Sequence, residues 1–259
     1  MTAQLKSTSE GRTMVLTLAN PSQRNALGPE IYAAGVEALN GAESSDEVRS
    51  VVIVGDGAWF SAGGSLQRLV QNRALDPAVQ AESIEGLHNW IDSIRTFPKP
   101  VIAAVEGAAA GAGFSLALAC DFVIAARDAV FAASYSNVAL SPDGGLSWHL
   151  AQSLPRQIAS EWLMNGERIA AERLHALGLV NQLTDSGQAL AGALALAATL
   201  NARASNSLAS IKELLSDARG ASLSAHLSAE RDHFVRNLHH ANAGIGIAAF
   251  LAKKPPQYG

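Results

Sequence analysis

The sequence predicts an α/β fold in which one core of alternating strands and helices is followed by a helical C-terminal region. In the first half of the chain, short runs rich in β-branched residues alternate with stretches in which apolar residues recur at near-helical spacing. From about residue 144 the chain is rich in Ala and Leu, with one short β-like piece at 179–183. A strand–helix half followed by a helical half is typical of one α/β core with a helical extension.

Turn residues bound the predicted elements of the first half. Residues 13–18 are predicted to form a strand that ends at Asn20-Pro21, and Pro29 suits the first turn of the next helix. The unbroken β-branched run at 50–54 is typical of a strand covered on both faces. Beyond it we expect a glycine-containing loop at 61–66 that leads into a helix, and then a polar amphipathic helix at 78–97. Two further strands are expected at 101–105 and 122–125. Between them we expect a small-residue turn at 107–113 and a short helix at 114–119.

Composition and charge exclude several classes of protein. The 259 residues are 48% hydrophobic, which excludes wholesale disorder, and the net charge of −4 gives no general attraction for nucleic acid. The single cysteine, Cys120, excludes an internal disulfide and cysteine-rich metal sites. The apolar stretch at 101–126 is interrupted by Glu106 and Asp121, so it predicts buried core rather than a membrane span. The first residues do not resemble a secretory signal, and we expect a cytoplasmic protein.

Two glycine-bearing loops, at 61–66 and 107–113, follow predicted strands and lead into helices. Small residues let backbone N–H groups approach a ligand, but GxxxxGK[ST] is absent and Gly111-Ala112-Gly113 does not continue as GxGxxG. A pair of N–H groups can instead hold a carbonyl oxygen while it gains negative charge. The alternative interpretation, that these are tight turns whose small residues serve packing, stays open at this point.

Six blocks of sequence, in order along the chain, resemble the crotonase family, the enoyl-CoA hydratases and isomerases. They are residues 20–27 (NPSQRNAL), 60–66 (FSAGGSL), 98–107 (PKPVIAAVEG), 110–121 (AGAGFSLALACD), 141–145 (SPDGG) and 250–255 (FLAKKP). Any one block is weak evidence, whereas six in the family's order cover essentially the whole chain.

The resemblance implies a crotonase-like spiral of ββα turns over residues 1–195 and a C-terminal helical trimerisation region over residues 196–259. It implies a homotrimer, or a hexamer made of two trimers. It also implies an acyl-CoA thioester as substrate, with CoA part of the substrate and no other cofactor. The family shares one step, the stabilisation of a thioester enolate by two backbone N–H groups, and the matching donors here are Gly64 and Ala112.

The residues that match the family's catalytic acids favour isomerisation over hydration. Hydratases of the family hold a water with two glutamates, but the matching positions here are Ser115 and Tyr135, whose hydroxyls are poor bases at neutral pH. Asp143 matches an aspartate of several family isomerases, including the phenylacetate-pathway isomerase that acts on a ring epoxide. One carboxylate suffices to take a proton from Cα and return it at Cγ. Alternatively, Asp143 caps a helix that begins at Gly144.

The resemblance also assigns residues to CoA binding and to the acyl pocket. Arg24, Lys99, Lys253 and Lys254 are candidate partners for the CoA phosphates, although a lone basic residue is more often solvated surface. Phe250 and Lys253 belong to the tail, which often reaches a neighbouring subunit's CoA. Ala26 and Ala62 would offer backbone groups to CoA. The acyl pocket is expected to contain His88, Tyr135, Leu140 and Trp148.

Three functions therefore compete. The leading hypothesis is an acyl-CoA isomerase that uses Asp143, and the second is an enoyl-CoA hydratase with atypical water activation. The third is a non-catalytic protein on this fold that binds acyl-CoA or RNA, and the net charge argues against RNA. We expect no metal site, because His239-His240 has no carboxylate at ligand spacing.

Overall fold

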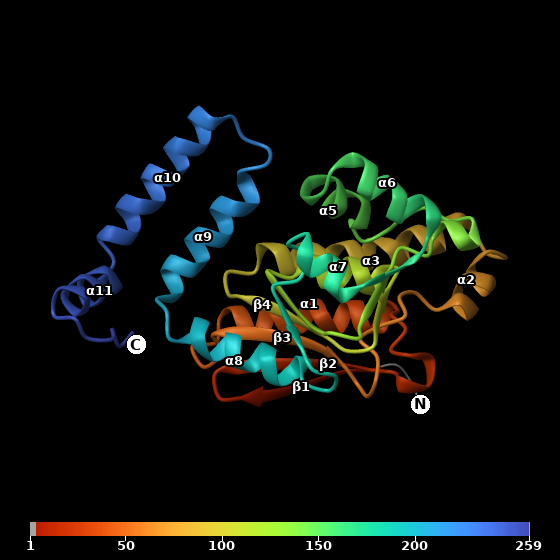
Figure 1. Ribbon diagram of the computed structural model, residues 1–259, viewed down its shortest axis with the longest axis horizontal. Coiled ribbons are helices and arrows are strands. Elements are labelled where there is room, and N and C mark those ends of the chain that lie inside the picture. Colours follow the sequence, from red (N-terminus) through yellow and green to blue (C-terminus); the bar gives the residue numbers. More distant parts are fainter. Residues whose placement is uncertain (1–3, 259) are drawn as a thin grey trace.

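A computed structural model describes residues 4–258, and its centre is a six-stranded sheet (Figure 1). The strands lie in the order β1-β2-β3-β4-β6-β9. Their bounds are β1 Gln4–Glu10, β2 Thr13–Ala19, β3 Ser50–Gly55, β4 Val101–Val105, β6 Phe122–Ala126 and β9 Gln182–Thr184. β1 and β2 are antiparallel, and the other neighbours are parallel. A smaller sheet contains β5 (Ala108–Ala110), β7 (Val130–Ala132) and β8 (Arg168–Ala170) in that order.

The four strands predicted in the first half are confirmed as β2, β3, β4 and β6. β3 is buried on both faces: Val51 and Ile53 belong to the main core, whereas Val52 lies in a second cluster on the opposite face. This two-sided burial explains the unbroken apolar run. β1 has no such signal, because its polar residues are mostly exposed at the sheet edge. Among residues 4–258, no helix combines the length and the apolar character needed to cross a bilayer.

Helices cover both faces of the large sheet (Figure 1). α1 (Pro29–Glu43) and α3 (Pro77–Thr96) pack on one face, where Gly35 approaches Trp90 so closely that no Cβ would fit. α8 (Ala189–Asn201) covers the other face with its buried alanines. The shorter helices are η1 (Pro21–Gln23), α2 (Leu66–Asn72), α4 (Ala112–Ala119), η2 (Ser136–Val138), α5 (Leu146–Ser153), α6 (Arg156–Asn165) and α7 (Ala171–Ala176).

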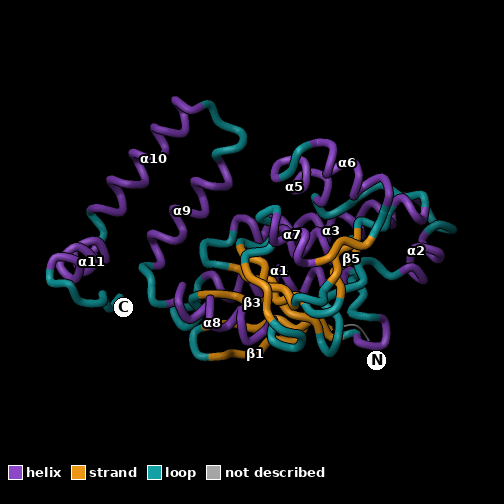
Figure 2. Tube along the Cα trace, viewed as in Figure 1, coloured by secondary structure: helices purple, strands orange, loops and turns teal. Residues whose placement is uncertain are grey.

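The last three helices form a C-terminal arm that extends away from the sheet (Figures 1 and 2). The arm contains α9 (Ser205–Asp217), α10 (Leu223–Leu238) and α11 (Ala241–Leu251). The predicted boundary between residues 195 and 196 needs correction, because it falls inside α8. That helix packs on β3, β4 and β6, so the core continues to about Asn201 and the arm begins after it.

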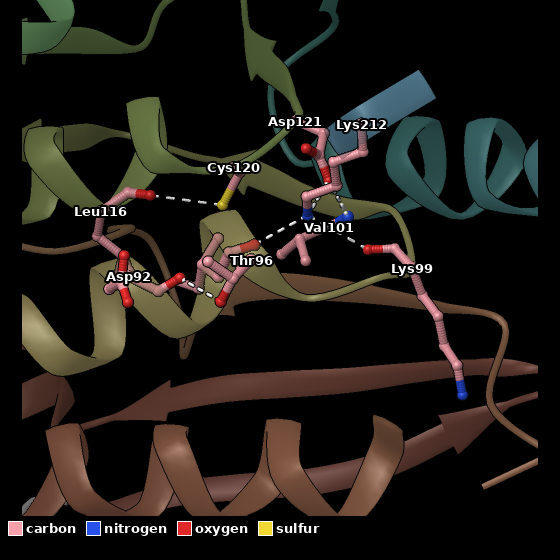
Figure 3. A network of polar contacts seen from close by, with 9 residues as sticks. Asp92, Thr96, Lys99, Val101, Leu116, Cys120, Asp121 and Lys212 are labelled. Atoms are coloured by element: carbon pink, nitrogen blue, oxygen red, sulfur yellow. Dashed lines mark hydrogen bonds and ion pairs between the residues drawn. The ribbon is translucent and has the colours of Figure 1, made fainter. Parts of the chain in front are cut away.

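An ion pair attaches the arm to the core (Figure 3). Lys212 of α9 donates from Nζ to Asp121 Oδ2 at 2.7 Å and to the carbonyl oxygen of Ile94 at 2.8 Å. The same carboxylate oxygen accepts from the backbone N–H of Val101 at 2.8 Å. Burial raises the pKa of Asp121 and lowers that of Lys212, and their mutual attraction opposes both shifts. The contact therefore fixes the first arm helix at the amino end of β4.

Candidate active site

A cavity of about 400 Å³ lies where the two glycine-bearing loops meet helices α2 and α3 and the segment 134–143. Much of its wall is apolar, and the aliphatic side chains that line it are Leu27, Leu66, Leu69, Ile84, Leu87, Val138 and Leu140. Of the described residues that line the cavity, Asp143 alone carries a carboxylate. The cavity can therefore accept an aliphatic chain and present one acid–base group to it.

Backbone contacts hold the two loops together at the cavity. Ser61 donates its N–H to the carbonyl oxygen of Ala108 at 3.0 Å and accepts from the N–H of Ala110 at 2.9 Å. Gly63 has φ +85°, and a Cβ there would lie 2.5 Å from the carbonyl oxygen of Ala110 and 3.1 Å from the nitrogen of Ala112. Only glycine fits this conformation at this distance without displacing the neighbouring loop.

The N–H groups of Gly64 and Ala112 find no acceptor in the described part of the chain. Both residues line the cavity, and no hydrogen bond among residues 4–258 has either N–H as its donor. Ala112 is the first residue of α4, so the helix itself leaves this N–H without a partner. Two such donors on one cavity can bind an oxygen atom that carries negative charge.

Asp143 is held by two hydroxyl residues, Tyr135 and Ser115. Its Oδ1 accepts a hydrogen bond from the Tyr135 hydroxyl at 2.6 Å. Ser115 donates from Oγ to the backbone carbonyl oxygen of Asp143 at 2.9 Å, and this Oγ lies 3.4 Å from the Tyr135 hydroxyl. The helix-cap alternative is wrong, because α5 begins after Gly145 and no side chain caps it.

The pKa of the Asp143 carboxyl group depends mainly on its burial. It raises the pKa of Asp143 above its usual value, while the hydrogen bond from Tyr135 and the charge of His88 oppose the rise. Burial and the neighbouring Asp143 carboxylate also raise the pKa of Tyr135, so the phenol stays a neutral donor. The site therefore combines a carboxylate of increased basicity with a donor that cannot replace it as the base.

Several residues predicted for the site lie at the cavity. Ala62, His88, Tyr135 and Leu140 line it together with Gly64, Ala112 and Asp143. Residues 24–27 run beside the first loop, since Ala62 donates its N–H to the Arg24 carbonyl oxygen at 2.9 Å and Leu27 donates to that of Gly63 at 2.8 Å. Ala26 is therefore adjacent to the cavity, and the Arg24 guanidinium lies 5.3 Å from the centre of the Trp59 ring.

Two predicted residues lie elsewhere. The Lys99 ammonium donates to the carbonyl oxygens of Ala42 and Ser45 at 2.6 and 2.8 Å, at the other end of the sheet, so it is not available to CoA at this cavity. The Trp148 ring packs between the guanidinium groups of Arg95 and Arg219, at 5.1 and 5.4 Å, and does not line the cavity.

The tail residues do not reach the cavity of their own chain. Phe250 lies in the last turn of α11 with 84% of its surface exposed, and Lys253 follows the helix with φ +54°. Neither residue lines the cavity, and the arm that carries them extends away from it (Figure 1). Their predicted contact with CoA therefore requires a second copy of the chain.

Sequence reasoning missed several polar residues of the cavity, and Tyr32 and Arg68 are the two of greatest chemical interest. Tyr32 occupies the buried face of α1, where an aromatic residue at helical spacing indicates ordinary core. Arg68 is a single cation on a short helix and resembles solvated surface. Within residues 4–258, no group of three or more His, Cys, Asp or Glu side chains is arranged to hold a metal, and His240 instead accepts from the N–H of Asn242 at the start of α11.

Comparisons with known proteins identify the family of the chain. The chain matches the family model described as enoyl-CoA hydratase/isomerase over residues 8–259. It is 35% identical over 254 residues to the 1,2-epoxyphenylacetyl-CoA isomerase of Escherichia coli (strain K12), a match that covers 96% of this chain and 95% of that protein. It is 32% identical over 247 residues to the 2,3-dehydroadipyl-CoA hydratase of the same strain, with 95% of each chain covered.

A solved structure gives the same result for the fold. The crystal structure of an enoyl-CoA hydratase from Polaromonas sp. JS666 is 70% identical and has a TM-score of 0.98, with 98% of this chain and 99% of that chain covered. The matches extend over the core and the arm alike. The chain belongs to the enoyl-CoA hydratase/isomerase family.

Proposed function

We propose that this enzyme is an acyl-CoA isomerase that moves a double bond through a thioester enolate, with Asp143 as the acid–base group. The observation that carries the proposal is the combination of one carboxylate with hydroxyl side chains at positions 115 and 135. A double-bond shift needs one group to move one proton, whereas hydration in this family uses a second carboxylate to activate water. No cofactor beyond the CoA of the substrate enters this reaction.

The unused N–H groups of Gly64 and Ala112 supply the other half of the mechanism. When Asp143 takes the proton from Cα, the C–H electron pair moves toward the thioester carbonyl and its oxygen becomes negative. Two N–H donors stabilise that charge, and removal of one donor of this kind typically costs about 10²–10³ in rate. The protonated Asp143 then returns the proton at Cγ, which places the double bond between Cα and Cβ.

The same groups suit the rearrangement of a ring epoxide, because that reaction also places negative charge on an oxygen and moves a proton next to the thioester. The Escherichia coli relative at 35% identity is named for an isomerase of this substrate type. The acyl group of this enzyme is therefore either a linear enoyl chain or an oxidised ring.

Hydration is the second candidate function, since the 70% identical structure is titled an enoyl-CoA hydratase. In that reaction Asp143 would accept a proton from water, and the hydroxyls of Ser115 and Tyr135 would help to position that water. Both candidates use the same carboxylate, so the product formed from each substrate distinguishes them.

The first prediction concerns Asp143→Asn assayed with a pure β,γ-enoyl-CoA. An amide has nearly the shape of the carboxylate and cannot take the proton, so the variant is expected to lose about 10²–10⁴-fold in kcat. Formation of the conjugated α,β-enoyl thioester, followed by its absorbance, measures the rate. The melting temperature of the variant is the control for folding.

Equal turnover by wild type and variant would contradict the role of Asp143. Product analysis with crotonyl-CoA tests the second candidate function. Formation of a 3-hydroxyacyl-CoA by the wild type at a rate above that of β,γ-isomerisation would replace isomerisation with hydration as the main activity.

The second prediction concerns pH and the Tyr135→Phe variant. The Tyr135 hydrogen bond lowers the pKa of Asp143, and the carboxylate is active only when it is ionised. Activity is therefore lost as the pH falls through this pKa, and the phenylalanine variant is expected to lose it at a higher pH than the wild type. The profile of kcat/KM against pH measures the shift. An acidic limb that stays in place, or moves to lower pH, would contradict the coupling.

The third prediction tests the contact between the loops with two glycine variants. Gly63→Ala would place a methyl group against the carbonyl oxygen of Ala110, so we expect the N–H groups to separate and kcat to fall about 10²-fold. Gly57→Ala is the matched control, because Gly57 also has positive φ but has open space around it. The control is expected to cost only about 1 kcal/mol of stability. Equal activity in the two variants would contradict the argument.

We also propose that the arm assembles the enzyme into a homotrimer, or into a hexamer of two trimers. α11 has no buried residue, and large apolar side chains are exposed along the last two helices: Leu223, Leu227, Phe234, Val235, Leu238, Ile245, Ile247, Phe250 and Leu251. A surface of this kind is typical of contacts between chains.

The fourth prediction is therefore a particle mass, measured by light scattering, of three or six times the 26.9 kDa chain. Phe234→Glu places a charge on this surface and is expected to produce smaller particles. Lys6→Glu, on the exposed strand β1, is the matched control and is expected to leave the mass unchanged. A wild-type mass of one chain would contradict the assembly.

A further inference from the structure

The wall of the cavity formed by α1, α2 and α3 carries polar groups that the proposed reaction does not use. They are Tyr32, Arg68, Asn72, Gln80 and Ser83. Asn72 donates from Nδ2 to Gln80 Oε1 at 2.7 Å, so these two amides satisfy one another in part. The Tyr32 hydroxyl and the Arg68 guanidinium take no part in this amide pair.

Tyr32 is a buried tyrosine whose hydroxyl opens to the cavity. Only 6% of the residue is exposed, and its ring packs 6.5 Å from that of Trp90 and against Gly86 of α3. No hydrogen bond among residues 4–258 involves the hydroxyl, although the residue lines the cavity. The hydroxyl oxygen is not one of the buried polar atoms that lack a partner among the described residues, so it opens to the cavity, where a bound group can accept its proton.

Arg68 offers N–H donors on the same cavity. Its Nη2 donates to Ser83 Oγ at 3.3 Å, and its Nη1 lies 3.9 Å from the exposed carboxylate of Glu30. One neutral partner and one long ion pair leave most of the five guanidinium N–H groups unused.

The Arg68 side chain packs against α1 and α3, and the same two helices surround Tyr32. Arg68 Nη1 lies against Gly28, and the N–H of Tyr32 donates to the Gly28 carbonyl oxygen at 3.1 Å, one helical turn along α1. On α3, Ser83 contacts Arg68, and Gly86, three residues later, contacts Tyr32. Residues three apart share a helix face, so both donors face one seam between α1 and α3.

Electrostatic interactions connect Tyr32 with both Asp143 and Arg68. The Asp143 carboxylate raises the pKa of Tyr32, as burial does, and the Arg68 guanidinium opposes the rise. The Tyr32 hydroxyl thus lies within electrostatic reach of both the acid–base group and the cation.

We propose that Arg68 and Tyr32 form a subsite for a carboxylate at the far end of the acyl group, so that the preferred substrates are CoA thioesters of unsaturated dicarboxylic acids. Guanidinium binds a carboxylate with two parallel N–H donors, and the tyrosine hydroxyl donates to one of the same oxygens. An acyl chain that ends in a methyl group would displace water from both donors without replacing its hydrogen bonds. The inference rests on the proposed function only in that the cavity binds acyl-CoA.

The test measures binding rather than turnover, so that it is independent of the reaction catalysed. Calorimetry compares the wild-type enzyme with pairs of saturated thioesters of equal length: butanoyl-CoA and succinyl-CoA, hexanoyl-CoA and adipoyl-CoA, octanoyl-CoA and suberoyl-CoA. At the length that spans the cavity, the carboxylate-ended member is expected to bind about tenfold more tightly. Arg68→Met is expected to abolish this preference, and Tyr32→Phe to reduce it.

Arg73→Met is the matched control, because Arg73 also belongs to the α2 segment but is exposed and does not line the cavity. It should keep the wild-type preference. The inference is overturned if the methyl-ended thioester binds as tightly at every length, or if Arg68→Met weakens both members of a pair equally. Loss of turnover in Asp143→Asn with this binding preference intact would separate the subsite from the acid–base role.

Discussion

The site depends on a backbone contact between two loops that are about 45 residues apart in sequence. Ser61 pairs with the main chain on both sides of Ala109, and the absence of a side chain at Gly63 lets the first loop lie against residues 110–112. This contact brings the N–H groups of Gly64 and Ala112 to one cavity. Because both donors belong to the main chain, no side chain can compensate if the loops move apart.

The second constraint is the pKa of Asp143, on which burial and hydrogen bonding have opposite effects. Burial alone favours the neutral acid, whereas the Tyr135 hydrogen bond favours the carboxylate. Because Tyr135 is itself too buried to ionise, it stabilises the base without competing for its role. Ser115 binds the backbone of Asp143 rather than its carboxylate, so the other carboxylate oxygen is left for the substrate. Ser115 thus fixes the position of Asp143, and Tyr135 adjusts the basicity of its carboxylate.

Much of this could be predicted from sequence because it depends on local patterns. β3 and β4 are recognisable as buried runs, and the loops as small-residue turns that follow strands. Lys99 was misplaced because it precedes β4, while the loops follow the carboxyl ends of the strands. Trp148 is five residues from Asp143, but the turn of α5 directs it toward Arg95. Tyr32 and Arg68 meet only through packing of α1, α2 and α3, which no local pattern encodes.

The charges in the cavity explain why hydroxyls at positions 115 and 135 suit proton transfer. In the proposed isomerisation, the negative charge resides on Asp143 before the reaction and on the thioester oxygen in the enolate, so the cavity neither gains nor loses charge. The charge moves over a short distance toward two N–H donors, which is favourable where water is largely excluded. An additional carboxylate beside Asp143 would raise its pKa further and repel the enolate. Neutral hydroxyls at these positions keep a single negative charge in the cavity, and the Arg68 guanidinium, whose ion pair with Glu30 is long at 3.9 Å, can meet a charge that the substrate brings.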